Sequence, residues 1–145
     1  MSARLSAADV GCWLLKSDRL PDAVAAGWAP DTERELERCV RRSYRLALMG
    51  PGQPVLLWCS GRTAPGVHAV GSLVDGPEER EGGPVVTVAL RRLAEPVPRA
   101  ALLADPVART AEVLRMPAGS NPSWLSHAEH AAVRALLPVS DPARR

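Results

Sequence analysis

Short apolar runs separated by turn residues dominate the hydrophobic pattern of this chain. Residues 11–16 and 55–60 are nearly continuous apolar segments, and residues 66–74 and 85–93 are rich in valine. Runs of this length and composition are typical of buried strands. The polar stretch at residues 75–84, between the last two runs, predicts a hairpin with a long polar loop.

Helical patterns lie between and after these strands. In residues 31–40 a possible capping aspartate precedes apolar positions spaced i, i+3, i+4, which predicts a helix, and residues 44–49 predict a short second one. A fifth strand is expected near residues 111–116, and residues 95–106 look like a crossing connection with a helical turn. Strand signals at this spacing, interrupted by helices, favour an α+β fold with a small curved sheet or barrel.

The C-terminal pattern is the clearest local signal. Ser126 and Glu129 form a capping box before an apolar stripe, and Pro138 ends the helical pattern. Residues 139–145 are then expected to be a frayed tail. At 145 residues the chain is predicted to be one domain, with a core spanning about residues 11–138.

Composition narrows the possible classes of protein. No apolar run approaches the roughly 18 residues of a membrane span, and the N-terminus lacks a signal peptide's apolar region, so a cytoplasmic location is expected. The cysteines, three in number and far apart, are expected to be small core residues. Lys16 is the only lysine beside seventeen arginines and Asn121 the only asparagine, which marks both positions for attention.

The net charge of +2 is too small for a purely electrostatic nucleic-acid binder, but the charge is unevenly spread. Arg38, Arg41, Arg42 and Arg45 fall within eight residues, and Arg62 follows a turn. Such a patch could neutralise a few phosphates. A solvated face balanced by nearby glutamates is the alternative on charge alone.

Aromatic and hydroxyl side chains alternate together on two predicted strands. Trp58 shares a face with Ser60, and Trp13 shares a face with Ser17. If the strands are neighbours, these pairs could form the walls of an aromatic pocket with a polar bottom. Burial of both indoles in the core is the alternative.

Four segments, in order, resemble the EVE domain family. Trp-Leu-Leu-Lys-Ser-Asp at residues 13–18 is similar to the family's opening strand, and residues 49–62 resemble its Gly-containing turn and strand ending in Trp-x-Ser-Gly. Residues 65–74 look like its Gly-Ile-x-Ala-Ile-Gly-x-Val strand, and residues 115–122 its closing Gly-Thr-Asn segment. Many relatives carry a different segment, with a Trp or Gly-Val-Arg-Asn-like pattern, at residues 39–44.

The resemblance implies a PUA-like fold, a small curved β-barrel of about five to six strands with helices packed outside, related to YTH and SRA-type readers. It also implies recognition of a modified base that is flipped out of the nucleic acid. The implied pocket residues are Trp13, Lys16, Ser17, Trp58, Ser60 and Asn121, with Ser43 or Tyr44 replacing the missing wall. The implied phosphate-binding residues are Arg41, Arg42, Arg45 and Arg62.

Other chemistries have weaker support. Cys59 with His68 could be a nucleophile and base, but no orienting acid is evident and Gly-x-Ser-x-Gly does not occur. His127 and His130 lack a third ligand with metal-site spacing, so no metal and no cofactor is expected.

The resulting hypothesis is a non-catalytic reader of methylated DNA bearing 5-methylcytosine or a related base. A reader of modified RNA such as N6-methyladenosine, a small-nucleotide hydrolase and a structural interaction module are the alternatives. Nucleic acid is the expected partner, and whether a separate restriction nuclease acts with the domain stays open.

Overall fold

The computed structural model describes residues 4–119 and 121–144. Its strands are β1 (Cys12–Ser17), β2 (Glu33–Cys39), β3 (Pro54–Cys59), β4 (Gly66–Arg80), β5 (Gly83–Pro98) and β6 (Ser123–Leu125). Its α-helices are α1 (Pro21–Val24), α2 (Arg99–Ala104), α3 (Glu112–Arg115) and α4 (His127–Ala135). Four 3-10 turns are η1 (Ala7–Asp9), η2 (Tyr44–Leu48), η3 (Ala108–Thr110) and η4 (Pro142–Arg144).

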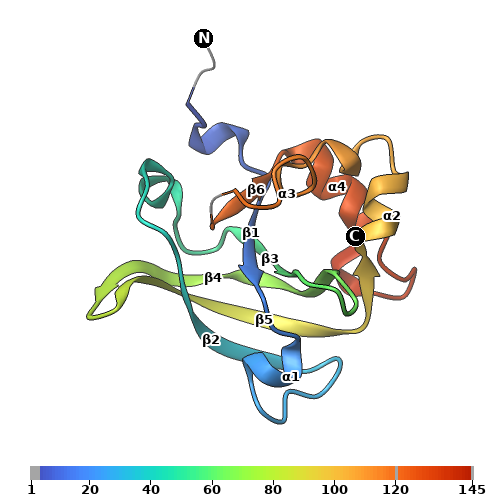
Figure 1. Cartoon of the computed structure of the whole chain (residues 1–145), viewed down its shortest axis with the longest axis horizontal. Coiled ribbons are helices and arrows are strands. Elements are labelled where there is room, and N and C mark those ends of the chain that lie inside the picture. Colours follow the sequence, from blue (N-terminus) through green and yellow to red (C-terminus); the bar gives the residue numbers. More distant parts are fainter. Residues whose placement is uncertain (1–3, 120, 145) are drawn as a thin grey trace.

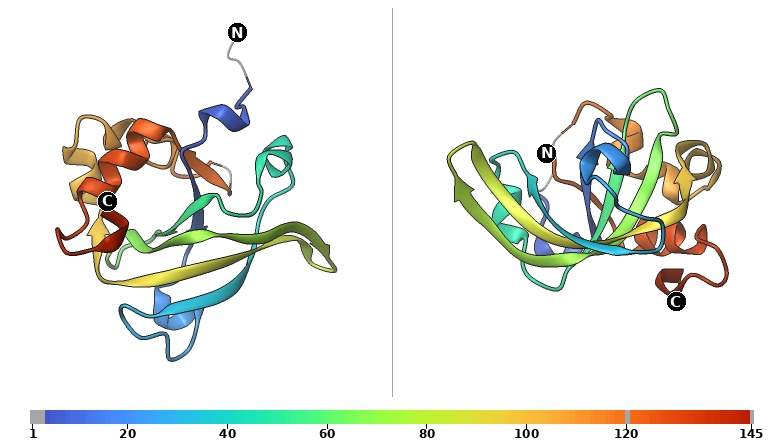
Figure 2. Two further views of the ribbon diagram at one scale, coloured as in Figure 1. Left: turned by 180° about the vertical axis from the view of Figure 1, so that it is seen from behind. Right: turned by 90° about the horizontal axis from the view of Figure 1, so that it is seen from below.

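The strands form one mixed sheet in the order β2-β5-β4-β3-β1-β6. β1 and β3 are parallel, and the other neighbours are antiparallel. The sheet curves strongly, with α2, α3 and α4 grouped along one side of it (Figures 1 and 2). It does not close into a barrel, because β2 and β6 are its edges and no ladder joins them. The expected α+β curved sheet is confirmed, and closure of the barrel is the part that is wrong.

Asn121 links β2, one edge of the open sheet, to β1 at one point. Its side-chain Nδ2 donates to the carbonyl of Cys39 at the end of β2 (3.3 Å), and its own carbonyl accepts from the N–H of Arg41 (2.7 Å). Its Oδ1 accepts from the N–H of Lys16 on β1 (3.1 Å). We call this junction the seam. Hydrogen bonds of one residue, two through its side chain and one through its backbone carbonyl, therefore connect these strands where no ladder does.

Two apolar clusters fill the two sides of the curved sheet. One lies within the curve and contains Trp13 and Leu15 of β1 with Val55 and Leu57 of β3. The other lies between the sheet and the helices, where Trp58 packs with residues of α2, α3 and α4. Alternation along β1 and β3 thus sends successive side chains into different cores.

Strands β1, β3, β4 and β5 were predicted correctly, and β6 was not predicted. The predicted helix at residues 31–40 is wrong. This segment is strand β2, which pairs with β5 over seven residues from Glu33 to Cys39. The alternation of charged residues suits an exposed edge strand, and pairing with β5 outweighs the weak helical spacing. The short helix at residues 44–49 is confirmed as the 3-10 turn η2.

Three further expectations need correction. The expected strand at residues 111–116 is helix α3. The expected long loop at residues 75–84 is instead ladder, since β4 runs to Arg80 and β5 begins at Gly83. Its residues are polar because both faces of the hairpin tip are exposed there, and polarity alone does not distinguish this from a loop. Residues 95–98 likewise continue β5 before the expected helical turn, α2.

The C-terminal capping box is confirmed. The Ser126 hydroxyl accepts from the N–H of Glu129 at 3.1 Å, and the Glu129 carboxylate accepts from the N–H of Ser126 at 2.8 Å. Within the expected tail, Asp141 is paired with Arg91 at 2.6 Å and its side chain is 8% exposed. Arg145 lies outside the described residues.

Candidate nucleic-acid interface

The carboxyl ends of β1 and β3 meet at one end of the sheet. Because the two strands are parallel, Lys16 lies opposite Trp58 and Ser17 opposite Cys59. Both strands end there, and the loop before β6 passes beside their ends. The fold therefore collects the polar ends of both motifs in one place.

Two hollows lie on either side of this point and share Lys16 and Ser60. The larger, about 410 Å³, opens beside the seam, and we call it the polar hollow; it is lined by Lys16, Ser17, Asp18, Glu37, Arg38, Cys39, Ser60 and Asn121. The smaller, about 270 Å³, is the Trp58 hollow, lined by Lys16, Trp58, Ser60, Gly61, Pro65, Arg99, Val113 and Pro117. Both are close to the lower limit of roughly 300 Å³ for small-molecule pockets.

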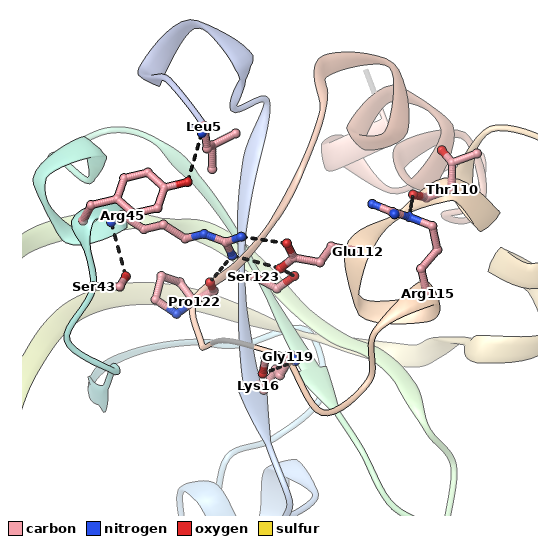
Figure 3. Close-up of polar contacts among 11 residues, drawn as sticks. Leu5, Lys16, Ser43, Arg45, Thr110, Glu112, Arg115, Gly119, Pro122 and Ser123 are labelled. Carbon is pink, nitrogen blue, oxygen red and sulfur yellow. Dashed lines mark hydrogen bonds and ion pairs between the residues drawn. The ribbon is translucent and has the colours of Figure 1, made fainter. Parts of the chain in front are cut away.

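Lys16 fixes the loop that separates the two hollows. Its ammonium donates to the carbonyls of Pro117 (3.1 Å) and Gly119 (2.9 Å), and Figure 3 shows its side chain directed at Gly119. One of its three protons is left for another acceptor. Burial lowers the pKa of Lys16; nearby Glu112 opposes this change and Arg45 adds to it.

The hydroxyls of the site are largely committed to the backbone. Ser17 Oγ donates to the carbonyl of Arg19 (2.8 Å) and accepts from its N–H (3.0 Å). Ser60 Oγ donates to the carbonyl of Ser17 at 3.2 Å and keeps its lone pairs. Ser17 is thus a turn residue, whereas Ser60 can still accept a hydrogen bond.

The structure brings together five of the eight expected pocket residues: Lys16, Ser17, Trp58, Ser60 and Asn121. Trp58 borders only the smaller hollow and is 4% exposed. Asn121 forms the seam and also borders the polar hollow.

Trp13 does not face this site. It is fully buried within the curve of the sheet, and its indole N–H donates to Gln53 Oε1 at 2.8 Å. The register pairs it with Val55, an odd number of residues from Trp58, so the two indoles lie on opposite faces. The expectation that both wall one pocket is wrong.

Ser43 and Tyr44 also lie elsewhere. Ser43 caps η2 by accepting from the N–H of Arg45 at 3.2 Å. The Tyr44 hydroxyl accepts from the N–H of Leu5 at 2.9 Å, and the Arg4 guanidinium stands 4.6 Å from the ring centroid. Neither residue lines a hollow beside Lys16, so neither replaces the missing wall.

Arg45 is a structural residue and not a free phosphate ligand. Its guanidinium forms two hydrogen bonds to Glu112, at 2.9 and 2.7 Å, and one to the carbonyl of Pro122 at 3.0 Å (Figure 3). Both side chains of the ion pair are 14% exposed. Burial tends to raise the pKa of Glu112, but hydrogen bonds from Arg45 and Ser123 hold it below its ordinary value.

The other arginines divide into paired and unpaired groups. Arg42 is held by Glu79 on the hairpin. Arg41 and Arg62 are exposed, and their guanidinium groups make no hydrogen bond or ion pair with a described residue. Arg38, half-buried in the polar hollow, likewise has none. The run of arginines in the sequence indicated this region as basic. Only the path of β2 beside the hollow shows that Arg38 is the arginine of the run that lines it.

Features for catalysis do not come together here. Cys59 lies within the curve of the sheet, and burial raises the pKa of its thiol to about 11, which disfavours the nucleophilic thiolate. His68 Nε2 lies 2.6 Å from the carbonyl of Ala64. Among the described residues, no three His, Cys, Asp or Glu side chains gather as metal ligands, and no helix is long and apolar enough to cross a membrane.

A further hollow, larger than the two beside Lys16, lies away from this site. It measures about 510 Å³ and opens between α4 and strands β3 to β5, with Arg91 and His130 on its rim. None of the residues that the sequence singled out for nucleic-acid binding lines it. Size alone therefore does not identify the functional hollow.

No protein-family model matches the sequence, and no curated protein matches it. Solved structures do match. The NMR structure of Rpa0253 from Rhodopseudomonas palustris is similar with a TM-score of 0.62 and 19% identity, covering 94% of this chain and 99% of that chain. The DUF55 domain of human thymocyte nuclear protein 1 gives 0.53 and 19%, covering 88% and 99%.

Human THYN1 was solved in complex with 5-methylcytosine-containing DNA. Its TM-score is 0.52 at 17% identity, and the match covers 84% of this chain and 94% of that chain. At these identities the similarities show the fold. The chain has the α+β PUA-like fold that the resemblance to EVE domains implied.

Proposed function

We propose that this domain is a non-catalytic reader of modified DNA, and that it takes an extruded base, 5-methylcytosine or a close relative, into the polar hollow. The observation that carries the proposal is the polar hollow itself. The Arg38 guanidinium and the Asp18 carboxylate, which have no hydrogen-bond or ion-pair partner among the described residues, face one small space there beside the ends of β1 and β3. The THYN1 complex with 5-methylcytosine DNA supports it, because that protein shares the fold.

Extrusion costs a few kcal/mol of stacking and pairing, which contacts to the flipped base must offset. Arg38 offers a planar guanidinium on which a base can stack. The remaining proton of Lys16 and the second Nδ2 proton of Asn121 can donate to acceptors on the base edge. Arg41 and Arg62 are exposed and unpaired, so they are the residues we assign to the phosphates.

The methyl group itself contributes little. Burying one methyl is worth about 0.8 kcal/mol, which corresponds to about fourfold in affinity. The preference for a methylated over an unmethylated base should therefore be modest, unless the hollow excludes water tightly.

Calorimetric titration with matched DNA and RNA oligomers, modified and unmodified, tests the proposal. Arg38→Ala should weaken binding of the modified DNA oligomer, since it removes the stacking surface. Arg42→Ala is the matched control, because Arg42 lies in the same run but is paired with Glu79 outside the hollow. Equal affinity of the native protein for every oligomer would contradict the proposal. Preference for RNA bearing N6-methyladenosine would replace it with the RNA alternative.

A further inference from the structure

The polar hollow contains one strong hydrogen-bond acceptor that no described residue uses. Asp18 follows β1 directly, lines the hollow and is exposed, and its carboxylate makes no hydrogen bond or ion pair with a described residue. The other carboxylate of the lining, Glu37, is held by Arg80 at 2.8 Å.

We propose that Asp18 accepts a hydrogen bond from the exocyclic amine of the bound base, so that the site selects an amine-bearing pyrimidine over thymine. This inference rests on the proposed function and specifies its substrate. Carboxylates are established partners of the cytosine N4 amine in base recognition.

The charges of the lining argue for a base, and against a phosphate, in this hollow. Lys16 and Arg38 are balanced by Asp18 and Glu37, so the formal charge of the lining cancels. A phosphate placed there would lie beside two carboxylates, which repel it. A neutral base edge that carries both donors and acceptors can instead satisfy both signs of charge.

The other polar groups leave the acceptor role to Asp18. The Ser17 hydroxyl is closed onto Arg19. The side chains of Lys16 and Arg38 carry donors alone, and the Asn121 amide oxygen already accepts from the N–H of Lys16. Ser60 keeps only the weaker lone pairs of a hydroxyl. A base edge with a donor next to acceptors matches this arrangement, and that is the edge of cytosine.

Thymine is the informative competitor because it has the same ring and the same 5-methyl group as 5-methylcytosine. It differs at C4, where a carbonyl replaces the amine, and at N3, which becomes a donor. Asp18 would then face an oxygen and lose its hydrogen bond. A site built to bind an N–H discriminates strongly against an analogue that lacks it, and we expect roughly tenfold to a hundredfold here.

The test uses short single-stranded oligomers with 5-methylcytosine, cytosine, thymine or uracil at one central position. Comparing their affinities distinguishes the contribution of the amine from that of the methyl group, and single strands avoid the cost of breaking a base pair. The native protein should bind 5-methylcytosine over thymine, and cytosine over uracil, by that factor. Asp18→Asn should reduce both ratios to within about threefold, because an amide can donate to the pyrimidine carbonyl.

Glu35→Gln removes the same charge from an exposed position of β2 outside the lining and is the matched control; it should leave both ratios unchanged. Equal binding of 5-methylcytosine and thymine by the native protein, or loss of the ratio in Glu35→Gln instead of Asp18→Asn, would overturn the assignment. If the methyl preference persists in that case, the reader function stands without this role of Asp18. If all four oligomers bind equally, both proposals fail.

Discussion

Replacing Arg45 with alanine should destabilise the protein without weakening its binding to DNA phosphates. In sequence this arginine belongs to the run that suggested a phosphate-binding patch. In the structure its guanidinium joins η2 to α3 through Glu112 and holds the carbonyl of Pro122 beside β6. The substitution therefore removes a connection between three separate segments of the chain.

The size of the effect follows from the burial of the pair. Removing one partner of a buried ion pair costs about 3–5 kcal/mol, because the other charge stays buried and unpaired. Both side chains keep 14% of their surface exposed, which lets water reach the orphaned carboxylate. We therefore take the lower end, about 3 kcal/mol. With an unfolding entropy of about 2.1 cal/mol/K per residue, this lowers Tm by about 10 °C in a chain of 145 residues.

Thermal unfolding followed by circular dichroism measures this change. The stabilisation that the ion pair contributes should depend on pH, since the folded-state pKa of Glu112 lies below the ordinary 4.5. A carboxyl with a depressed pKa stabilises the fold above its unfolded pKa, and this contribution is lost as the pH falls through the folded pKa. The stability difference between the native protein and Glu112→Gln should accordingly be full at neutral pH and shrink below about pH 4.5.

Arg41→Ala is the comparison variant. It removes an exposed, unpaired guanidinium, so it should change Tm little but reduce the slope of log affinity against log salt by about one. Arg45→Ala, measured well below its Tm, should keep the native slope. The opposite result, with an unchanged Tm and a reduced slope for Arg45→Ala, would refute the structural role of this ion pair.

Three further outcomes are expected. Trp13→Phe should cost about 1–3 kcal/mol in urea unfolding, through lost packing and the lost hydrogen bond to Gln53, while oligomer binding by the folded variant stays native; a selective loss of binding would return Trp13 to the site. Burial, with nearby positive charge, lowers the pKa of His130 from 6.5 to about 4. As the pH falls from 6.5 to 4, the unfolded chain binds a proton at this residue before the folded chain does, so the free energy of unfolding should decrease over that range. His130→Gln should remove that part of the pH dependence, and an unaltered profile would contradict it. A thiol reagent should label Cys39 quickly in the native protein and the two other cysteines, which are buried, only after unfolding; prompt labelling of all three would contradict the burial.

Local patterns predicted the fold wherever one segment determines its own structure. The capping box of Ser126 and Glu129 is such a case, and so is the apolar run of β3. The prediction failed at residues 31–40, where pairing with β5 decides between strand and helix. No window of sequence contains that partner.

The site was partly predictable for the same reason. Lys16, Ser60 and Asn121 lie together beside the polar hollow, because the motif determines which residues end each strand. The face shared by Trp13 and Trp58 depends on the register of β1 against β3, which is a tertiary fact. Arg38 and Asp18 were missed as lining residues, because only the approach of β2 to β1 across the seam brings them to one hollow.

Because β2 is an edge of the open sheet, its residues can shape the polar hollow without being part of the core. Its Glu37, Arg38 and Cys39 line the polar hollow from a sheet edge whose residues are largely exposed. Substitutions there should alter ligand preference at little cost in folding free energy, so specificity can diverge or be redesigned while the scaffold stays constant. The same edge must stay charged to resist strand-to-strand association with other molecules. An aromatic wall introduced on β2 to strengthen stacking would therefore trade solubility against affinity.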